Sequence, residues 1–216
     1  MIIRGENLGV SLAEKRVFHG VNVKLRPGTV TALVGPSGSG KTLLLQTLGG
    51  MVSPSEGSVW VDKEESSGWS DSQKLRFWRE SAAFIQQDYG VVEEETVAFN
   101  VTMKSSLWGR TIIPDPARLK EVLSRVGLQG RDKEIAARLS GGEKQRVAIA
   151  RALYKRARVW FADEPTASLD AQNQGLIREL FREAAAPAAR KEGATIVVAT
   201  HDLAFARQCD QVVELG

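Results

Sequence analysis

Short apolar runs alternate with amphipathic stretches along most of this 216-residue chain. The runs are rich in β-branched residues and are bounded by glycine, proline or polar residues, a pattern that predicts strands. On this basis we expect strands at residues 21–25, 29–34, 59–61, 81–87, 159–162, 195–199 and 211–215.

Helical spacing of apolar residues appears between these runs. Apolar positions recur at i, i+3, i+4 and i+7 from Leu119 to Val126, after Asp115-Pro116 and before Gly127. Aspartate followed by proline starts a helix, and glycine ends one. We predict helices at residues 43–48, 115–126, 146–153 and 171–186.

Apolar strands that alternate with helices indicate an α/β fold with a parallel sheet covered on both faces. Such sheets bind ligands at the carboxyl ends of their strands. The segment from about Asp88 to Leu139 departs from this alternation and is mainly helical. We therefore expect one domain over 1–216, with residues 1–87 and 146–216 as the core and residues 88–145 as a helical insert.

The composition, with 43% apolar and 25% charged residues, is that of an ordinary soluble globular protein. The single cysteine, Cys209, cannot form an internal disulfide and is interpreted as a small apolar filler in a reducing compartment. Met1–Glu6 lacks the apolar core of an export signal, and no apolar run approaches the ~18 residues that cross a bilayer. If the protein works at a membrane, we expect another chain to provide the spans.

The net charge is +3, from 29 basic and 26 acidic residues. The densest basic stretch, residues 125–158, is interrupted by Asp132, Glu134 and Glu143. Dedicated nucleic-acid binders usually concentrate their excess charge on one face. We interpret the stretch as a solvated surface that also faces phosphate or acidic lipid, and we expect no nucleic-acid partner.

A glycine-rich string with the spacing Gly-x-x-x-x-Gly-Lys-Thr lies between a predicted strand and a predicted helix. In this phosphate-binding loop (P-loop), backbone N–H groups converge on the β-phosphate, Lys41 reaches the β- and γ-phosphates, and the Thr42 hydroxyl ligates Mg²⁺. The strand–loop–helix context favours this function over a glycine-rich turn that only caps a helix. The residues expected to bind the phosphates of a nucleoside triphosphate are Gly35, Pro36, Ser37, Gly38, Ser39, Gly40, Lys41 and Thr42.

Two carboxylates, Asp163 and Glu164, follow the apolar run 159–162. A buried strand would bring Asp163 to its tip, where a carboxylate can hold hydrated Mg²⁺. Glu164 leaves the strand one residue later and can orient and deprotonate the attacking water. An apolar strand that ends in Asp-Glu is common by itself, and the P-loop in the same sheet favours the catalytic interpretation.

His201 follows the apolar run 195–200 and so lies at the carboxyl end of another predicted strand. An imidazole there can hydrogen-bond the γ-phosphate and the attacking water. Because it shares an edge with the P-loop and Asp163, we predict a catalytic role for it. His19 has no such placement and is interpreted as structural.

A second glycine-rich turn opens a helix nearly a hundred residues after the first. A helix N-terminus of this kind is a second anion-binding surface. Two such turns so far apart in one chain suggest that two copies trap nucleotide between them. The residues of this turn are Leu139, Ser140, Gly141, Gly142 and Glu143.

With these motifs together, the chain resembles the nucleotide-binding subunit of an ABC transporter over nearly its whole length. Residues 139–143 match that family's signature, which other P-loop enzymes lack. The resemblance implies a P-loop NTPase with a RecA-like parallel core, a small antiparallel β subdomain and an inserted helical subdomain. It also implies an ATPase that uses ATP and Mg²⁺ and pairs head to tail as a homodimer. Each ATP would be held by one P-loop and by the partner's signature turn.

Further roles come from positions that match the family pattern. Gln87 resembles the glutamine that ligates Mg²⁺ and senses the membrane partner, because Asp88-Tyr89 follow it; Gln86 is the alternative. The resemblance implies an integral membrane permease bound through the groove near Gln87 and the helical subdomain. The chain would then be cytoplasmic and peripheral on the inner face of the cell membrane. The loop by which the two subunits touch matches Ser168, Leu169 and Asp170.

Two positions depart from the family pattern. Leu12 stands where an aromatic residue usually stacks on adenine, so that either adenine packing is weaker or Phe18 substitutes. The stretch 91–96 is acidic instead of rich in leucine and proline. Because this segment usually lies near the groove for the permease's coupling helix, we expect basic residues on the partner.

Within the family, the chain is most similar to lipoprotein-releasing, macrolide-efflux, haem-efflux and cell-division cassettes. This similarity rests on residues 87–89, the segment 97–101 and the short length. This similarity favours export or extrusion of a hydrophobic or membrane-embedded substrate such as a lipoprotein, drug, haem or peptide. The main alternative is a cassette of the cell-division type, which regulates a periplasmic enzyme without moving cargo. The chain ends at Gly216, and we expect no regulatory domain of the sugar-importer kind.

Three other classes of protein fit less well. An ATPase that acts on ribosomes usually carries two cassettes in one chain. A chromosome or repair ATPase needs a long coiled coil between the P-loop and the signature, and no sustained heptads occur there. A small-molecule kinase has no use for the signature turn.

Overall fold

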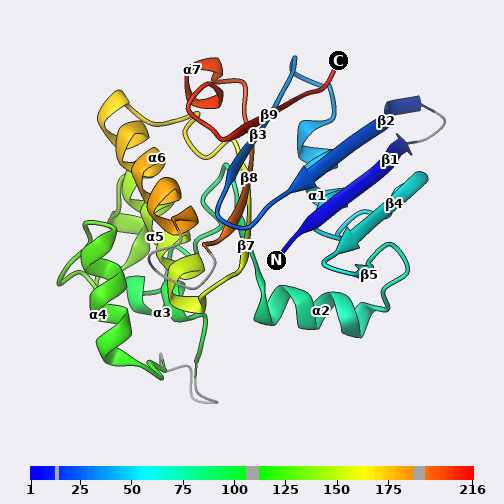
Figure 1. Ribbon diagram of the computed structural model, residues 1–216. Helices are drawn as coiled ribbons and strands as arrows, with labels where there is room; N and C mark the ends of the chain where they lie inside the picture. The colour runs from blue at the N-terminus through cyan, green and yellow to red at the C-terminus, as the bar shows by residue number, and fades with distance from the viewer. Residues whose placement is uncertain (13–14, 106–111, 187–192) are drawn as a thin grey trace.

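The computed structural model describes residues 1–12, 15–105, 112–186 and 193–216, and its centre is a five-stranded parallel sheet (Figure 1). The strands lie in the order β6-β7-β8-β3-β9, and each pairs with its neighbours in parallel. Their bounds are β3 Val30–Val34, β6 Ala82–Ile85, β7 Val159–Asp163, β8 Thr195–Ala199 and β9 Gln211–Glu214.

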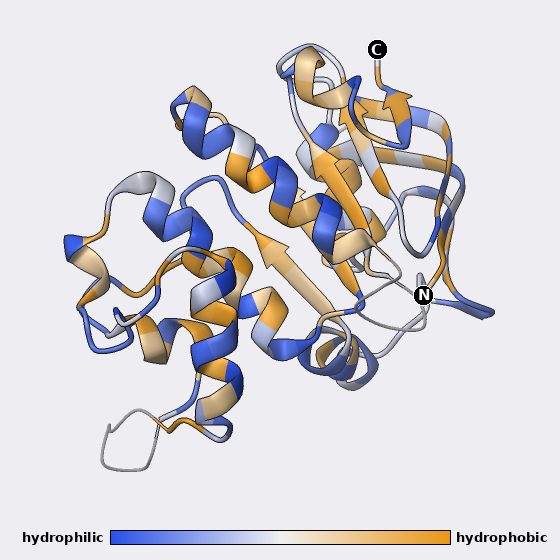
Figure 2. Ribbon diagram, turned by 60° about the vertical axis from the view of Figure 1, so that its left-hand side comes forward, coloured by the Kyte–Doolittle hydropathy of each residue, from blue (hydrophilic) through white to orange (hydrophobic). Residues whose placement is uncertain are grey.

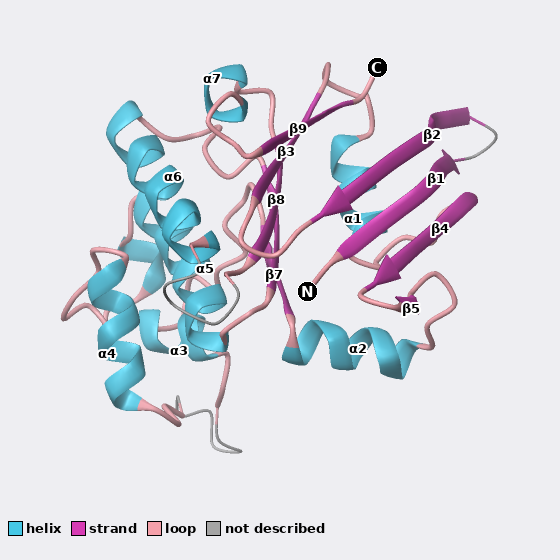
Figure 3. Cartoon of the chain, viewed as in Figure 1, coloured by secondary structure: helices cyan, strands magenta, loops and turns pink. Residues whose placement is uncertain are grey.

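A second, antiparallel sheet in the order β2-β1-β4-β5 lies beside the first (Figure 3). Its long strands β1 and β2 pair from Ile3↔Leu25 to Leu12↔Lys15. Irregularities in register interrupt this ladder, and bulges of this kind increase the local twist of a sheet. The bounds are β1 Ile3–Leu12, β2 Lys15–Leu25, β4 Glu56–Val61 and β5 Glu64–Glu65.

The helices cover both sides of the parallel sheet (Figure 1). Helix α1 lies between the two sheets, whereas α5 and α6 cover the opposite face and α3 and α4 pack outside α5. The bounds are α1 Lys41–Leu48, α2 Asp71–Glu80, α3 Val97–Thr102, α4 Pro116–Arg125, η1 Ala136–Arg138, α5 Gly141–Lys155, α6 Ala171–Ala185 and α7 Leu203–Ala206. No helix in these described ranges has both the length and the apolar character that a membrane span requires.

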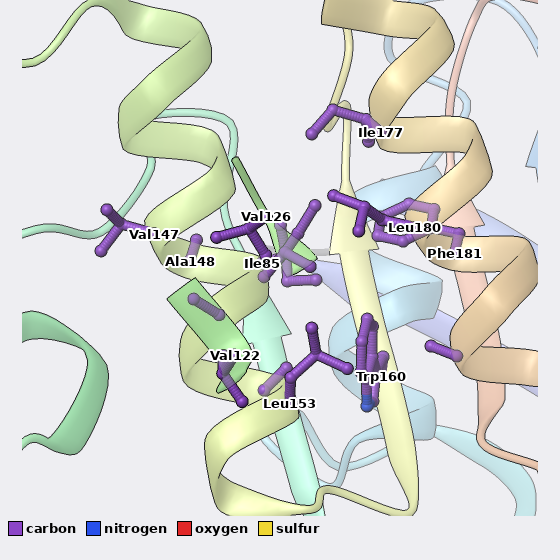
Figure 4. Packing of buried hydrophobic residues seen from close by; sticks show 14 of the residues in the cluster. Ile85, Val122, Val126, Val147, Ala148, Leu153, Trp160, Ile177, Leu180 and Phe181 are labelled. Carbon is purple, nitrogen blue, oxygen red and sulfur yellow. The ribbon is translucent and has the colours of Figure 1, made fainter. Parts of the chain in front are cut away.

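The core has one large apolar cluster on each face of the parallel sheet. Along β7, Trp160 and Ala162 belong to the cluster under α5 and α6, whereas Val159 and Phe161 belong to the cluster under α1 and the antiparallel sheet. This two-residue alternation follows from the pleat of the strand. Figure 4 shows Trp160 between the side chains of α5 and α6, and Figure 2 shows the apolar strands enclosed by helices of mixed character.

The fold expected from the sequence is confirmed, and its element boundaries are corrected in places. The strand predicted at 21–25 is the second half of the longer β2, and it belongs to the antiparallel sheet. The helix predicted at 146–153 begins at Gly141 and runs to Lys155, so it crosses the boundary set at residue 145. Strand β1 and helices α2, α3 and α7 were not predicted as elements. The expected helical insert includes residues 106–111, which lie outside the described residues.

Candidate functional site

The P-loop leaves β3 and runs directly into α1, as its spacing predicts. Gly40 caps α1 with φ 92°, and Gly38 has φ 81°, a conformation that costs glycine little. The buried Lys41 Nζ donates to the carbonyls of Gly35 at 2.9 Å and Pro36 at 3.1 Å. The Ser39 hydroxyl is also buried, and no described residue hydrogen-bonds it. The Lys41 ammonium therefore binds two carbonyls of its own loop, at the start of α1.

Thr42 and Asp163 meet at the carboxyl end of β7. The Thr42 hydroxyl donates to Asp163 Oδ1 at 3.0 Å. Burial, with a smaller contribution from the negative charge of Glu164, raises the pKa of the Asp163 carboxyl, although the Thr42 hydrogen bond opposes the shift. A hydroxyl and a partly buried carboxylate are oxygen ligands of the kind that Mg²⁺ prefers, so this pair fits a magnesium site that phosphate oxygens complete.

Glu164 follows β7 in a left-handed conformation, with φ 45°. Its backbone N–H donates to Ala199 O at 2.9 Å, which ties it to the end of β8. Its side chain is 16% exposed and its Oε1 lies 3.0 Å from Nδ1 of His201, whose side chain is 65% exposed. A strained backbone that the surrounding structure holds in place is typical of functional positions. The structure thus joins the two residues that the sequence predicted separately.

Gln87 lines a pocket of about 570 Å³ that also includes Asp163 and Ser168. Gln86 lines it too, but its side-chain oxygen lies close to Gly90, where an added Cβ would be 2.5 Å from Gln86 Oε1. The pocket therefore brings together Gln87, the end of β7 and the first residue of the predicted subunit-contact loop.

The signature turn begins α5 with a reciprocal capping box. Glu143 N–H donates to Ser140 Oγ at 3.3 Å, and Ser140 N–H donates to Glu143 Oε2 at 2.7 Å. Arg131 forms ion pairs with both Glu143 and Glu134. Burial raises the pKa of the Glu143 carboxyl, but the hydrogen bonds from Ser140 and Arg131 outweigh it and leave the pKa below its ordinary value. Glu143 therefore stabilises the turn as a carboxylate.

The predicted subunit-contact loop ends at Asp170, which caps α6. Asp170 Oδ1 accepts from Asn173 N–H at 2.8 Å, and Asn173 Nδ2 donates to Asp170 Oδ2 at 2.8 Å. Asn173 Oδ1 accepts from Arg146 of α5, and a Cβ at Gly142 would be 2.7 Å from Asn173 Cγ. Asn173 thus links this loop to the signature helix. Leu169 lies in the same turn, where its carbonyl accepts from Gln174 Nε2 at 3.0 Å.

Two residues of the antiparallel sheet, Phe18 and Leu12, bear on the prediction about adenine binding. Phe18 is 6% exposed and belongs to the core, with its ring against Gly40, where a Cβ would be 2.9 Å from Phe18 Cδ1. Phe18 also lines a pocket that includes Ser39 of the P-loop, so its stacking on adenine stays a prediction. Leu12 is 54% exposed, and it leaves an aliphatic side chain at the end of β1.

The predicted site residues fall into two groups. The P-loop, Asp163, Glu164 and His201 lie at the carboxyl edge of the parallel sheet, and Gln87 joins them through its pocket. Residues 139–143 lie at the start of α5, and none of them lines that pocket. Sequence reasoning missed Arg131 and Asn173, because only tertiary contacts connect them to the signature turn. It also gave Tyr89 no role beyond its place in a motif.

Three comparisons with known proteins bear on the family of the chain. The sequence profile of the ABC transporter family matches residues 18–167. The chain is 39% identical to the lipoprotein-releasing system ATP-binding protein LolD of Pseudomonas syringae pv. tomato, over 99% of this chain and 94% of that protein. It is 36% identical to the macrolide export ATP-binding/permease protein MacB of Agrobacterium fabrum, over 93% of this chain and 30% of that protein.

Solved structures show the same fold. A dimeric post-hydrolysis state of the ATP-binding cassette MJ0796 bound to ADP and phosphate superimposes with a TM-score of 0.82. It is 28% identical to this chain and covers 99% of it, and the chain covers 94% of that structure.

Proposed function

The chain belongs to the ABC transporter family as an ATP-binding subunit that hydrolyses ATP to drive transport, and we propose that two copies close head to tail around two ATP molecules. The observation that carries this proposal is the separation of the two phosphate-binding turns. The P-loop begins α1 and the signature turn begins α5, and these two helices cover opposite faces of the parallel sheet. We infer that the signature turn of one copy serves the P-loop of the other. The dimeric state of the related cassette MJ0796 supports the same arrangement.

In the proposed site, Lys41 exchanges the carbonyls of Gly35 and Pro36 for phosphate oxygens. Phosphate oxygens carry the negative charge that the carbonyls lack, so the exchange adds Coulomb attraction to the ammonium and favours ATP. The N–H groups that begin α1 add the positive end of the helix dipole. Ser140, Gly141 and Gly142 would offer the same kind of surface to the γ-phosphate in the partner's P-loop, from the start of α5.

Thr42, Asp163 and Gln87 are the residues that would hold Mg²⁺ together with phosphate oxygens. The ion would neutralise charge that develops on the phosphates during the transfer. It would also offset the cost of burying the ionised Asp163. Among the described residues, no group of three or more His, Cys, Asp or Glu side chains could hold a metal ion. The proposed site instead combines the Asp163 carboxylate with the Thr42 hydroxyl, the Gln87 amide and phosphate oxygens.

Hydrolysis would use Glu164 and His201 as a pair. Glu164 accepts a proton from the attacking water, while His201 donates through Nδ1 to Glu164 Oε1. The other ring nitrogen, Nε2, would then face the γ-phosphate as a hydrogen-bonding group. The hydrogen bond to Glu164 thus orients the ring that stabilises the departing phosphoryl group.

ATP would first stabilise the closed dimer and then serve as the substrate of hydrolysis. The closed dimer is favoured only because it gives the γ-phosphate a second set of donors, and hydrolysis removes those contacts. To test this, the oligomeric state of the Glu164→Gln variant is measured by sedimentation with and without ATP. We expect a dimer that requires ATP. A variant that stays monomeric at saturating ATP, alone and with its membrane partner, would contradict the proposal.

We further propose that the chain drives export or extrusion of a hydrophobic or membrane-embedded substrate from the inner face of the cell membrane. Its similarity to a lipoprotein-releasing protein and a macrolide exporter supports this class of cargo. The permease would dock beside Gln87 and the helical subdomain, where Val92 is 39% exposed and Glu94 is exposed.

The acidic segment 91–96 supports a basic coupling helix on the permease. A cassette of the cell-division type, which regulates a periplasmic enzyme without moving cargo, is the competing proposal. Identifying the membrane protein that co-purifies with the chain tests both: an exporter-like external domain supports extrusion, and one that recruits a hydrolase supports the alternative.

A further inference from the structure

Tyr89 contacts both parts of the nucleotide-facing surface. It lines the same pocket as Gln87, Asp163 and Ser168. Its hydroxyl lies against the signature turn, because a Cβ added at Gly141 would be 2.5 Å from Tyr89 Oη and 3.3 Å from its Cζ. A larger residue at position 141 would therefore displace this phenol.

The backbone at Tyr89 is held in an unfavourable conformation. Tyr89 has φ 68° and Gly90 has φ 55°, so two successive residues are left-handed immediately after Gln87-Asp88. The left-handed region costs a residue with a side chain roughly 1–2 kcal/mol, and such strain persists only where the surrounding structure imposes it. A hydrogen bond from Tyr89 N–H to Gln86 O, at 3.2 Å, closes the turn.

Arg151 ties the same turn to α5 at a second point. Its Nη2 donates to Gly90 O at 2.9 Å, and its Nε donates to Asn100 O at 2.8 Å. Burial lowers the pKa of the Arg151 guanidinium, and these carbonyls replace the water that it loses. Arg151 lies ten residues after Gly141 (151 − 141), or about 15 Å along the helix. The turn at 89–90 therefore contacts α5 near its start and again three turns later.

We propose that Tyr89 is a positioning residue of the ATPase, which couples the Gln87 segment to the signature turn of the same copy. A change at Gln87 when nucleotide or the permease binds would reach Gly141 through the phenol ring. If the signature turn is already ordered before it binds the partner's γ-phosphate, binding does not have to supply the conformational entropy lost in ordering it. This inference rests on the proposed function, because it assumes that the signature turn binds the partner's ATP.

The test uses three variants of the full chain in the Glu164→Gln background. Tyr89→Ala removes the contact, Tyr89→Phe keeps the ring, and Tyr154→Ala changes the chain's other tyrosine, whose hydroxyl accepts from Asp115 N–H near the far end of α5. A fluorescent ATP analogue measures nucleotide affinity at protein concentrations too low for dimers. Sedimentation then measures ATP-dependent dimerisation.

We expect Tyr89→Ala to weaken dimerisation about tenfold while the nucleotide affinity of the monomer changes by less than about twofold. Tyr89→Phe and Tyr154→Ala should dimerise like the parent. If Tyr89→Ala dimerises like the parent, the inference is wrong. It is also wrong if the nucleotide affinity of the Tyr89→Ala monomer falls as much as its dimerisation does. A parent that stays monomeric with ATP, alone and with its membrane partner, would contradict the proposed function, and this inference with it.

A second measurement tests the contact without nucleotide. Gly141→Ala should lower the Tm of the nucleotide-free chain, because its Cβ meets Tyr89 Oη. Adding Tyr89→Phe should restore part of the loss, since the nearest ring atom is then 3.3 Å away. An unchanged loss in the double variant would show that the phenol does not bear on Gly141.

Discussion

The two regions that we propose to bind nucleotide are assembled in different ways. The P-loop region, made of residues 35–42, Asp163, Glu164 and His201, follows directly on strands β3, β7 and β8 of one sheet. The signature region, residues 139–143, is held by side chains outside its own helix, among them Tyr89 and Arg131. Pairing of neighbouring strands brings their carboxyl ends to one edge of the sheet. The start of a helix, in contrast, is positioned by the side chains that pack against it. We therefore expect the chemistry to depend on single residues of the first region, and assembly of the dimer to depend on the second.

The same chemical change in each region should separate catalysis from assembly. Glu164→Gln removes the proton acceptor and should lower kcat about 10²–10⁴-fold, the usual contribution of a general base. Glu143→Gln keeps an oxygen for Ser140 N–H but loses the carboxylate that pairs with Arg131, so kcat should fall by less than about tenfold. Phosphate release by the chain joined to its membrane partner measures both. Equal losses would remove the distinction between the regions.

A lysine substitution tests the P-loop region for nucleotide affinity. Lys41→Ala removes a charged donor and should raise the Kd for ATP about 10- to 100-fold, since a hydrogen bond to a charged group contributes about 1.5–3 kcal/mol. Lys155→Ala is the matched control, because Lys155 Nζ also donates to a backbone carbonyl, Ala82 O at 2.7 Å. Calorimetric titration should show unchanged ATP affinity for the control. Undiminished affinity of Lys41→Ala would contradict the phosphate role of Lys41.

Removing a helix cap should affect assembly only in the signature region. Ser140→Ala loses an N-cap worth about 1 kcal/mol of unfolding free energy, and it should also weaken ATP-dependent dimerisation. Ser70→Ala removes the equivalent capping box of α2 and serves as the control. Denaturant unfolding should give similar losses of stability for the two variants. If both variants dimerise equally well, Ser140 has no role beyond capping.

The smallest effect concerns stability in the P-loop region. Burial raises the pKa of the Asp163 carboxyl in the folded chain above its ordinary value of 3.8. The protonated carboxyl therefore makes its full contribution to the free energy of unfolding below pH 3.8, and this contribution is lost as pH rises through the pKa of the folded chain. Asp163→Asn should therefore raise the Tm of the nucleotide-free chain at pH 7, by about 2–4 °C for a gain near 1 kcal/mol. The difference from the parent should narrow on acidification. A lower Tm would mean that the ionised carboxylate stabilises the fold.

The same contrast explains how far the sequence could predict the structure. Local spacing identifies Lys41, and apolar runs place Asp163 and His201 at strand ends, so the sheet edge could be predicted residue by residue. The left-handed turn at Tyr89 has no local signal except Gly90. The pairing of Arg131 with Glu143 spans 12 residues and depends on how η1 and α5 pack. Strand β1 could not be predicted, because register shifts in its pairing interrupt the alternation of buried apolar and exposed polar residues along it.

The most direct test of the composite site mixes two defective copies, both in the Glu164→Gln background. One carries Lys41→Ala and the other carries Ser140→Phe, so that each alone lacks one part of every site. In a head-to-tail pair of the two, one site still combines an intact P-loop with an intact signature turn. The account predicts that the mixture sediments with ATP as a dimer, although neither variant does so alone. A mixture that stays monomeric, beside a Glu164→Gln parent that dimerises, would contradict the claim that two copies complete each site.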